Sequence, residues 1–275
     1  MPELPEVETI KRSLEKKLLG TVITEVKIYL PKVIRLQTQD AFIQQITGKK
    51  IIGLGRRGKY LLIHLSENLT LVIHLRMTGR LVYTSPCTPA KHTHAVFILD
   101  SGFELHFNDT RQFGKIILSP SNELDAVPGL KDLGIEPLDE NFDKNVFRRD
   151  LRRRRAKIKS LLLDQTFIAG LGNIYVDEAL HRARINPQRI AASLKPREVT
   201  NLYHAIRKVL REGIKNRGTT FRDYVDGDGR MGNYQELLRV YSREGQPCLN
   251  CETEIKRMKL GGRSSYFCPR CQKAK

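Results

Sequence analysis

Four of the five cysteines form two closely spaced pairs near the C-terminus, Cys248 with Cys251 and Cys268 with Cys271. Each C-x-x-C pair places two thiolates on one tight turn, and a hairpin between the pairs can bring them together. Four thiolates complete a tetrahedron and leave no open position on the metal. The spacing therefore predicts one structural Zn²⁺ that contributes folding energy rather than chemistry. Two disulfides are the alternative, which an intracellular chain disfavours. The remaining Cys87 has no predicted role.

The residues that follow the initiator methionine can also carry chemistry. Removal of Met1 next to the small Pro2 would expose a secondary amine, and an α-amino pKa of about 7.7–8.0 leaves a reactive neutral fraction at physiological pH. Such an amine can attack an aldehyde-like carbon and form an iminium, which is an electron sink for elimination. The adjacent carboxyl group of Glu3 can transfer protons. An N-terminal proline without any function is common, however, so these two residues alone do not define a site.

Two further motifs indicate binding of an anion. Six cations occupy the eight positions from Arg152 to Lys159, which is too dense a cluster for one helix to balance with its own acids. The turn Gly170-Leu171-Gly172 precedes Asn173 at an expected helix start, where backbone N–H groups can bind an anion and Asn173 can act as cap or ligand. This turn lacks the third glycine and the preceding strand of a dinucleotide-binding loop. A solvated helix face and an ordinary helix start are the alternatives.

The composition of the whole chain also favours binding of an anion, because positive charges are in excess. Among 275 residues, 48 Lys and Arg against 30 Asp and Glu give a net charge of +18, which favours association with polyanions through counterion release. Nucleic acid is therefore the expected partner. An anionic membrane surface is the alternative, but no segment is apolar enough to span a bilayer and no lipidation signal is present. The N-terminus lacks the features of a secretory signal, so we expect a cytoplasmic protein.

The periodicity of apolar residues predicts the elements that position these groups. Val7, Ile10, Leu14 and Leu18 recur at helical spacing and predict an N-terminal helix that ends near Gly20. Eight runs rich in Val, Ile, Leu and Tyr follow, and that many short strands predict a sandwich or a barrel. These runs cover residues 22–29, 50–54, 60–65, 69–75, 81–83, 95–99, 103–107 and 115–118.

A stretch rich in Pro, Gly and acidic residues at 128–143 separates this region from a helical one. Beyond it the apolar period changes from about 2 to about 3.5 residues. Helices are expected at 145–164, 174–182, 196–216 and, briefly, 234–238, with loops at 217–220 and 226–229. The cysteine module comes last.

Four motifs, taken in order, resemble the formamidopyrimidine-DNA glycosylase family. They are PELPEVET at 2–9, RGKYL at 57–61, GLGNIY at 170–175 and the terminal cysteine finger. The resemblance covers the whole chain and implies an α+β multidomain fold. An N-terminal antiparallel β-sandwich with a flanking helix would occupy 1–133, a linker and helix-two-turn-helix domain 134–235, and a C-terminal β-hairpin zinc finger 236–275.

The resemblance also implies catalytic roles. Pro2 would be the Schiff-base nucleophile at the sugar C1′, and Glu3 a proton donor in base release and ring opening. Lys59 would be the proton donor of β-elimination, although without the family it would be interpreted as a solvated strand lysine. Arg263, between the cysteine pairs, would contact phosphate and assist δ-elimination.

Six positions match DNA contacts of the family: Met77, His92, Arg111, Phe113, Arg154 and Asn173. Of these, Met77, Arg111 and Phe113 look like side chains that enter the duplex. Flipping out a base costs a few kcal/mol, which apolar and planar side chains offset in part by filling the void. Met77 and Phe113 would otherwise be interpreted as core residues, and His94 as a structural one.

Two positions depart from the family pattern. Gln112 stands where many relatives carry a second basic residue, which puts one phosphate contact in question. Ser242 stands where the family often has glycine, so a different local turn is expected at the start of the finger.

The activity implied by the resemblance is excision of oxidised purines, 8-oxoguanine and formamidopyrimidines, from double-stranded damaged DNA, followed by β,δ-elimination. No redox cofactor or catalytic metal is expected, and the protein would be a monomer associated with the bacterial nucleoid through DNA. An endonuclease VIII-like glycosylase specific for oxidised pyrimidines is one alternative, but that branch typically has glycine at the position of Leu4. A non-enzymatic zinc-dependent DNA-binding protein is the other, and it would leave Pro2, Glu3 and Lys59 without a purpose.

Overall fold

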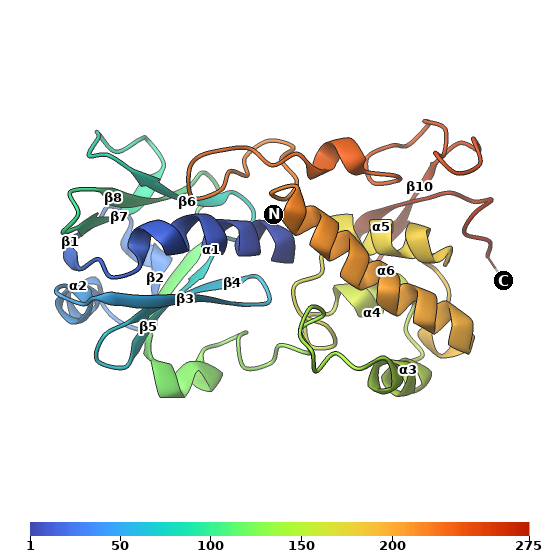
Figure 1. Ribbon diagram of the computed structural model, residues 1–275, viewed down its shortest axis with the longest axis horizontal. Helices are drawn as coiled ribbons and strands as arrows, with labels where there is room; N and C mark the ends of the chain where they lie inside the picture. Colours follow the sequence, from blue (N-terminus) through green and yellow to red (C-terminus); the bar gives the residue numbers. More distant parts are fainter. Residues whose placement is uncertain (275) are drawn as a thin grey trace. The chain divides into compact units, whose positions relative to one another are not determined.

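The computed structural model describes residues 1–274, and the chain divides into two compact units (Figure 1). Unit 1 consists of Met1–Asp132 and Ile214–Gln235. Unit 2 consists of Leu133–Gly213 and the residues from Glu236 onward. The domain boundaries expected from the sequence, at 133/134 and 235/236, stay a prediction.

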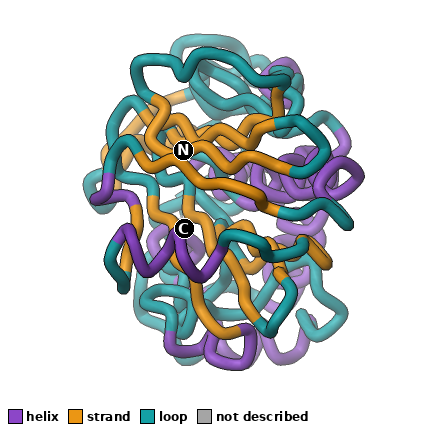
Figure 2. Tube along the Cα trace, turned by 90° about the vertical axis from the view of Figure 1, so that its left-hand side faces the viewer, coloured by secondary structure: helices purple, strands orange, loops and turns teal. Residues whose placement is uncertain are grey.

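Unit 1 is built on two β-sheets, and the strands of this unit face the viewer in Figure 2. The four-stranded sheet has the order β1 (Ile23–Ile28), β7 (Thr93–Leu99), β8 (Glu104–Asp109) and β6 (Gly79–Thr84). The five-stranded sheet has the order β2 (Ile34–Arg35), β9 (Lys115–Pro120), β5 (Leu69–His74), β4 (Tyr60–Leu65) and β3 (Ile51–Arg57). All neighbours are antiparallel except β2 and β9.

All eight strands expected from the sequence are present. The alternation of β4 explains why the prediction worked, because Leu61, Ile63 and Leu65 all point into the core that the two sheets share. The turn between β7 and β8 also forms as expected. Gly102 has a φ of +77°, a left-handed conformation that glycine adopts at little cost.

Helix α1 (Leu4–Leu18) lies against β3 and β4, and it is the dark blue helix of Figure 1. Its apolar residues at helical spacing are fully buried, as the sequence predicts. Pro5 lies in the first turn, where its missing N–H costs nothing. Lys16 and Lys17 in the last turn interact favourably with the helix dipole. The helix thus fixes the first residues of the chain at one end of the sandwich.

Periodicity did not reveal β2 or helix α2 (Gln39–Ile46), because both are too short to repeat a pattern. Helix α2 buries only Phe42 and Ile46, and its N-terminus is capped by the Thr38 hydroxyl, which accepts the Ala41 N–H at 3.3 Å. Two 3₁₀ helices, η1 (Pro31–Val33) and η2 (Ser121–Ala126), complete the unit together with the segment that returns after α6.

Unit 2 is helical and carries a C-terminal hairpin. Its α-helices are α3 (Lys144–Arg152), α4 (Ile158–Leu163), α5 (Asn173–Ala183) and all but the last two residues of α6 (Pro196–Lys215). Strands β10 (Lys256–Leu260) and β11 (Arg263–Phe267) form the hairpin, and η3 (Ala191–Ser193) precedes α6. The short helix expected at 234–238 is the 3₁₀ helix η4 (Tyr234–Leu237).

The prediction of a single helix at 145–164 is wrong, because this range contains two separate helices, α3 and α4. The backbone between them pairs with a distant segment instead. The N–H groups of Ala191 and Ala192 donate to the carbonyls of Ala156 and Arg154 at 2.9 and 3.0 Å, and Ile158 N–H donates to Arg189 O at 2.7 Å. Adjacent like charges also disfavour helix in this arginine run. The break therefore reflects non-local pairing that local periodicity cannot report.

Among the described residues, every helix is too short or too polar to cross a lipid bilayer.

Replacing Phe97 by alanine tests where the core of unit 1 lies. Phe97 is fully buried and packs edge-to-face on Phe42, with ring centroids 6.4 Å apart. We expect Phe97→Ala to lower the free energy of unfolding by about 3–5 kcal/mol in chemical denaturation, because it leaves a cavity. Phe103→Ala is the control, since that ring is 40% exposed, and its loss is expected to be much smaller. Equal losses would contradict the placement of the core.

Candidate functional site

The N-terminal tip of the chain is held by a buried carboxylate that the sequence reasoning missed. Pro2 and Glu3 are buried at the start of α1. The Glu3 N–H donates to Glu6 Oε2 at 2.8 Å, and the Thr219 N–H donates to Glu6 Oε1 at 2.7 Å. Gly218, at φ +80°, leaves room for this contact, because a Cβ there would lie 2.8 Å from Glu6. The available signal was an acid three residues after the N-cap.

Lys59 lies in the turn between β3 and β4 and is largely buried. It is one of three positive charges, with Arg76 and Lys115, that lie near His74. Burial, assisted by the charges of Arg76, Lys59 and Lys115, lowers the pKa of His74 to about 3, so this imidazole is neutral. Burial and the charges of Arg76 and Arg35 also lower the pKa of Lys115. This surplus of positive charge around Lys59 suits an anionic ligand.

Met77, Arg111 and Phe113 form one cluster in unit 1. The Arg111 guanidinium lies 3.0 Å from Met77 Sδ and 5.1 Å from the centroid of the Phe113 ring. Met77 is 43% exposed and Phe113 is 50% exposed. The interpretation of Met77 and Phe113 as core residues is therefore wrong. An exposed apolar cluster that carries a cation can insert into a binding partner.

Asp109 organises the loop that carries this cluster. Its carboxylate is buried and accepts the N–H groups of Arg111 at 3.2 Å and Gly114 at 2.7 Å, and the Thr78 hydroxyl also donates to it. Gly114 cannot be larger, because a Cβ would lie 2.5 Å from Phe107. Sequence reasoning missed Asp109 because nothing distinguishes this acid from other acids at the end of a strand.

The two histidines near β7 differ in their environment. His92 is half-buried next to β7, and its carbonyl accepts the Asp109 N–H at 3.0 Å. His94 is buried, and its Nε2 lies within 2.7 Å of Asp109 O. Gln112, the residue that departs from the family pattern, has a φ of +57°. His94 is therefore a structural residue, as the sequence indicates.

In unit 2, Arg154 and Asn173 lie in different settings. The exposed Arg154 guanidinium lies 5.9 Å from the centroid of the Phe167 ring. Asn173 is the first residue of α5, and the N-cap is Gly172, so the expected capping role of Asn173 is wrong. Its Nδ2 instead donates to Ser264 O at 2.9 Å. Because Nδ2 carries two hydrogens, this bond uses one of its two N–H groups, and a phosphate contact at Asn173 can come from the other one or from the backbone.

Arg263 is the exposed first residue of β11 and follows two glycines. Gly261 and Gly262 have φ values of +56° and +76°. The residue after Arg263 is fixed firmly, because Ser264 O accepts Lys159 Nζ at 2.9 Å in addition to Asn173. The strand that bears Arg263 is therefore held against the helices of its own unit.

Two acids on α5 accept hydrogen bonds from the backbone of the finger. Asp177 pairs with Lys159 at 2.7 Å, both side chains are fully buried, and Asp177 Oδ2 accepts the Tyr266 N–H at 3.0 Å. Burial raises the pKa of Asp177 to about 7, although the Lys159 ammonium opposes this shift. Burial likewise raises the pKa of Glu178, opposed by three backbone hydrogen bonds. These come from the N–H groups of residues 239, 240 and 241 at 2.9–3.1 Å.

Ser242 keeps a glycine-like turn at the start of the finger. Its φ is +59°, in the left-handed region that glycine adopts most easily. The departure from the family pattern therefore does not remove the left-handed conformation that a glycine would favour.

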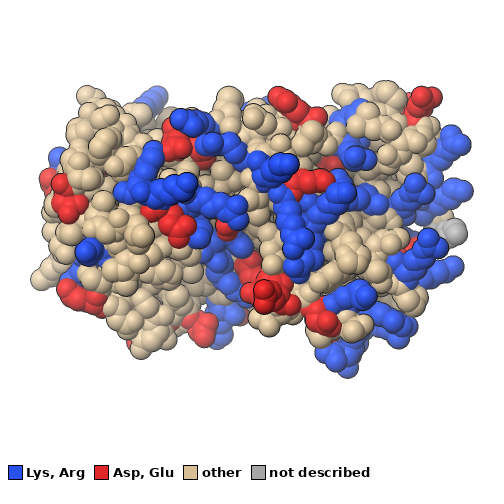
Figure 3. Space-filling view, in the orientation of Figure 1, with Lys and Arg blue, Asp and Glu red and all other residues tan. Residues whose placement is uncertain are grey.

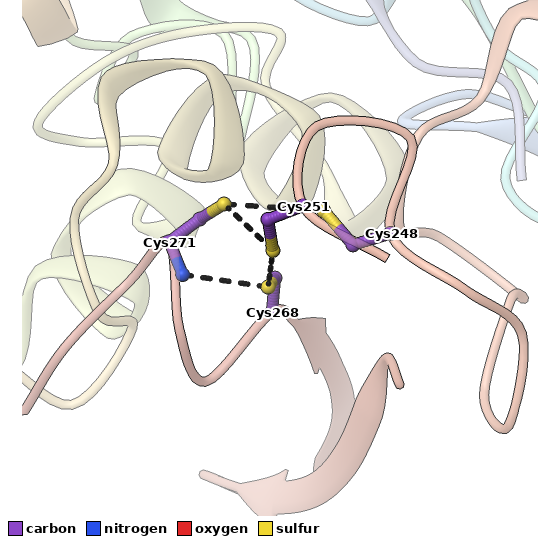
Figure 4. A group of neighbouring side chains, drawn as sticks. All are labelled: Cys248, Cys251, Cys268 and Cys271. Atoms are coloured by element: carbon purple, nitrogen blue, oxygen red, sulfur yellow. Dashed lines mark hydrogen bonds between the residues drawn. The ribbon is translucent and has the colours of Figure 1, made fainter. Parts of the chain in front are cut away.

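The four C-terminal cysteines lie together (Figure 4). Their sulfur atoms are all within 4.8 Å of one another, and none of the cysteines forms a disulfide, which rules out the disulfide alternative for this structure. Three of the Sγ···Sγ distances are 3.5, 3.5 and 3.9 Å, and a tetrahedron with Zn–S bonds of about 2.3 Å has edges of roughly 3.8 Å. The donor set and its spacing fit one Zn²⁺. Cys87 lies alone on the surface.

Positive charge dominates the face that Figure 3 shows. Lys and Arg side chains form broad continuous areas there, whereas Asp and Glu form small separate groups. This agrees with the net charge of +18 and with an anionic partner.

Three family models match the chain in order. The formamidopyrimidine-DNA glycosylase N-terminal domain matches residues 1–116, the formamidopyrimidine-DNA glycosylase H2TH domain matches 133–225, and a zinc finger found in FPG and IleRS matches 245–274. The chain is 61% identical to the formamidopyrimidine-DNA glycosylase of Pelotomaculum thermopropionicum and 58% identical to that of Desulforamulus reducens, over 100% of each chain. It therefore belongs to the formamidopyrimidine-DNA glycosylase family.

Solved structures agree with this assignment. The Lactococcus lactis Fpg in complex with DNA that contains an abasic site is 37% identical, with a TM-score of 0.93 over 99% of this chain and 100% of that one. The same enzyme with Fapy-dG-containing DNA has a TM-score of 0.92 at the same identity and coverage. The expected α+β fold and the single structural zinc of the four cysteines are both confirmed.

Glu178→Ala tests the attachment of the finger. The substitution leaves three N–H groups, one buried and two half-buried, without their acceptor, and a buried donor without a partner costs about 1–3 kcal/mol. We expect a clear decrease in the free energy of unfolding of unit 2, measured by chemical denaturation of the zinc-loaded protein. Glu212→Ala removes a half-buried ion pair with Arg182 and should cost at most about 1 kcal/mol. The attachment would not depend on Glu178 if the two variants were equally stable.

Proposed function

We propose that this chain is a bifunctional DNA glycosylase and abasic-site lyase of base-excision repair that removes oxidised purines. The observation that carries the proposal is its identity of up to 61%, over the full length, with proteins named formamidopyrimidine-DNA glycosylase. The relatives solved with Fapy-dG-containing and abasic DNA support damaged DNA as the partner. The sequence match extends through Pro2, Glu3 and Lys59, residues that a simple DNA-binding protein would not need.

The first step of the proposed reaction replaces the damaged base. Once Met1 is removed, the nitrogen of Pro2 attacks C1′ of the sugar, the C1′–N bond to the base breaks, and the base leaves with a proton. Glu3, adjacent to the nucleophile, is the proton donor for base release and for opening of the sugar ring. The product is a covalent iminium between Pro2 and C1′, because a secondary amine forms this species directly.

The iminium then serves as the electron sink for two eliminations. A base takes a proton from C2′, the C3′–O bond breaks and the 3′ phosphate leaves, with Lys59 as the associated proton donor. A further elimination breaks the C5′–O bond and expels the 5′ phosphate, with Arg263 in contact with it. Water then hydrolyses the iminium, which frees Pro2 and releases the sugar fragment, and a one-nucleotide gap bounded by phosphates remains. The positive charges around Lys59 favour binding of the anionic leaving groups.

Substrate binding uses the exposed cluster of Met77, Arg111 and Phe113. Its apolar surface and cationic plane can fill the space left in the duplex when the damaged nucleotide is extruded. His92, Arg154 and the N-terminus of α5 at Asn173 are proposed phosphate contacts. We further propose that the substrate is double-stranded, that the protein acts as a monomer, and that it resides in the cytoplasm, bound to the nucleoid.

The nucleophile can be tested by borohydride trapping on a duplex that carries 8-oxoguanine opposite cytosine. The methionine-processed protein is expected to form a covalent adduct, and Pro2→Gly should reduce that adduct strongly, because glycine offers a primary amine in a looser chain. An undamaged duplex is the control. Tight binding without any adduct would favour a non-enzymatic DNA-binding protein. Trapping only on oxidised pyrimidines would favour an endonuclease VIII-like enzyme.

Arg263→Ala should separate the two eliminations. We expect the variant to cut 3′ of the abasic site while accumulating the β-elimination product at the expense of the gapped product, as resolved on a denaturing gel. Arg257→Ala on the paired strand β10 is the matched control, since Arg257 pairs with Glu244 and Ser264 instead. If both variants gave the wild-type product ratio, Arg263 would have no role in δ-elimination.

A further inference from the structure

One buried histidine approaches the zinc cluster from α5. His181 is fully buried, and its Nε2 lies 3.5 Å from the Sγ of Cys248. It lies one turn beyond Asp177 and Glu178, the two acids that bind the backbone of the finger. His181 is thus a side chain of the helical part of unit 2 that contacts a zinc-binding sulfur.

The direction of this contact follows from the hydrogen-bonding capacity of its two atoms. A metal-bound thiolate can only accept, so Nε2 must carry the proton. The other ring nitrogen, Nδ1, is buried and has no hydrogen-bond partner among the described residues. A proton on Nδ1 would be a buried donor without an acceptor, which is costly. The surroundings therefore select the tautomer with hydrogen on Nε2.

A hydrogen-bond donor at Cys248 stabilises the negative charge of the four-cysteine cluster. Four thiolates around one Zn²⁺ leave two negative charges uncompensated, and Cys248 and Cys268 are fully buried. The sulfur of Cys268 receives the N–H of Cys271 at 3.4 Å. At Cys248, the His181 ring supplies the corresponding N–H. Hydrogen bonds to a charged acceptor are stronger than those between neutral groups.

We propose that His181 is an outer-shell residue of the zinc site, whose Nε2–H holds Cys248 as a zinc-bound thiolate and slows loss of the metal. Outer-shell partners of metal ligands typically change metal affinity by about 10–100-fold. His181 therefore protects the finger from loss of its zinc to a chelator.

The test compares variants of the zinc-loaded, full-length protein. His181→Phe preserves a planar ring and removes the donor, whereas His181→Gln keeps an N–H near the position of Nε2. His204→Phe is the control, because His204 is an exposed histidine on α6. Each protein is mixed with excess chelator at neutral pH, and zinc release is followed with a chromogenic indicator.

We expect His181→Phe to have a zinc affinity lower by about 10-fold or more and to release zinc correspondingly faster. His181→Gln should be close to wild type, and His204→Phe should equal it. Wild-type retention by His181→Phe would overturn the proposal. Equally fast release from the phenylalanine and glutamine variants would also overturn it, since the ring would then act by packing alone.

A second measurement does not depend on the folding of any variant. NMR of the zinc-loaded wild-type protein, with isotope-labelled histidine, identifies the tautomer of His181 from the chemical shifts of its two ring nitrogens. Hydrogen on Nε2 is the expected result. Hydrogen on Nδ1 alone would exclude donation to Cys248 and would refute the proposal, whatever activity the enzyme shows.

Discussion

The burial of two neighbouring carboxylates on α5 is the constraint on which unit 2 depends. A buried carboxylate is costly unless hydrogen bonds satisfy it, and here Asp177 and Glu178 are satisfied by backbone N–H groups of the finger and by Lys159. The finger therefore supplies donors that the buried acids of α5 need, and the acids fix the backbone of the finger. The zinc ion closes the finger on itself, but the carboxylates fix where its hairpin, with Arg263, stands relative to α5.

In unit 1, two other buried carboxylates also accept hydrogen bonds from backbone N–H groups. Glu6 accepts backbone N–H groups from the N-terminal tip and from the loop at Thr219, while Asp109 accepts those of the loop that bears Arg111. In each case, a buried acid on a regular element orders an irregular segment that presents a proposed functional side chain. Such segments have little apolar surface of their own to bury, so directional hydrogen bonds must supply the order that packing supplies elsewhere.

The sequence predicts the elements that apolar packing orders, but it does not predict the segments that hydrogen bonds to buried acids order. Strands such as β4 and the helix α1 were predictable because their apolar periods record which face is buried, and the cysteine spacing defined the metal site. The separation of α3 from α4 was not, because the backbone near Ala156 pairs with residues more than thirty positions away. Glu6 and Glu178 were missed for the same reason, since they accept N–H groups 213 and 62 residues away, respectively. Asp109 accepts nearby N–H groups, but nothing in the sequence distinguishes it from other acids at the end of a strand. An acid that serves distant N–H groups looks, in a sequence, like any solvated acid.

The contact between Glu178 and the start of the finger is made to the main chain alone. Side chains at positions 239 and 241 can therefore be exchanged without loss of these hydrogen bonds, whereas the residue at 240 must stay apolar, because Val240 is fully buried in a cluster with Cys248, Ile255 and Cys268. Proline is the exception, because it has no N–H to donate. A finger of different composition could be grafted onto the same helix, provided that it offers three consecutive amide groups in this arrangement and an apolar side chain at the middle position.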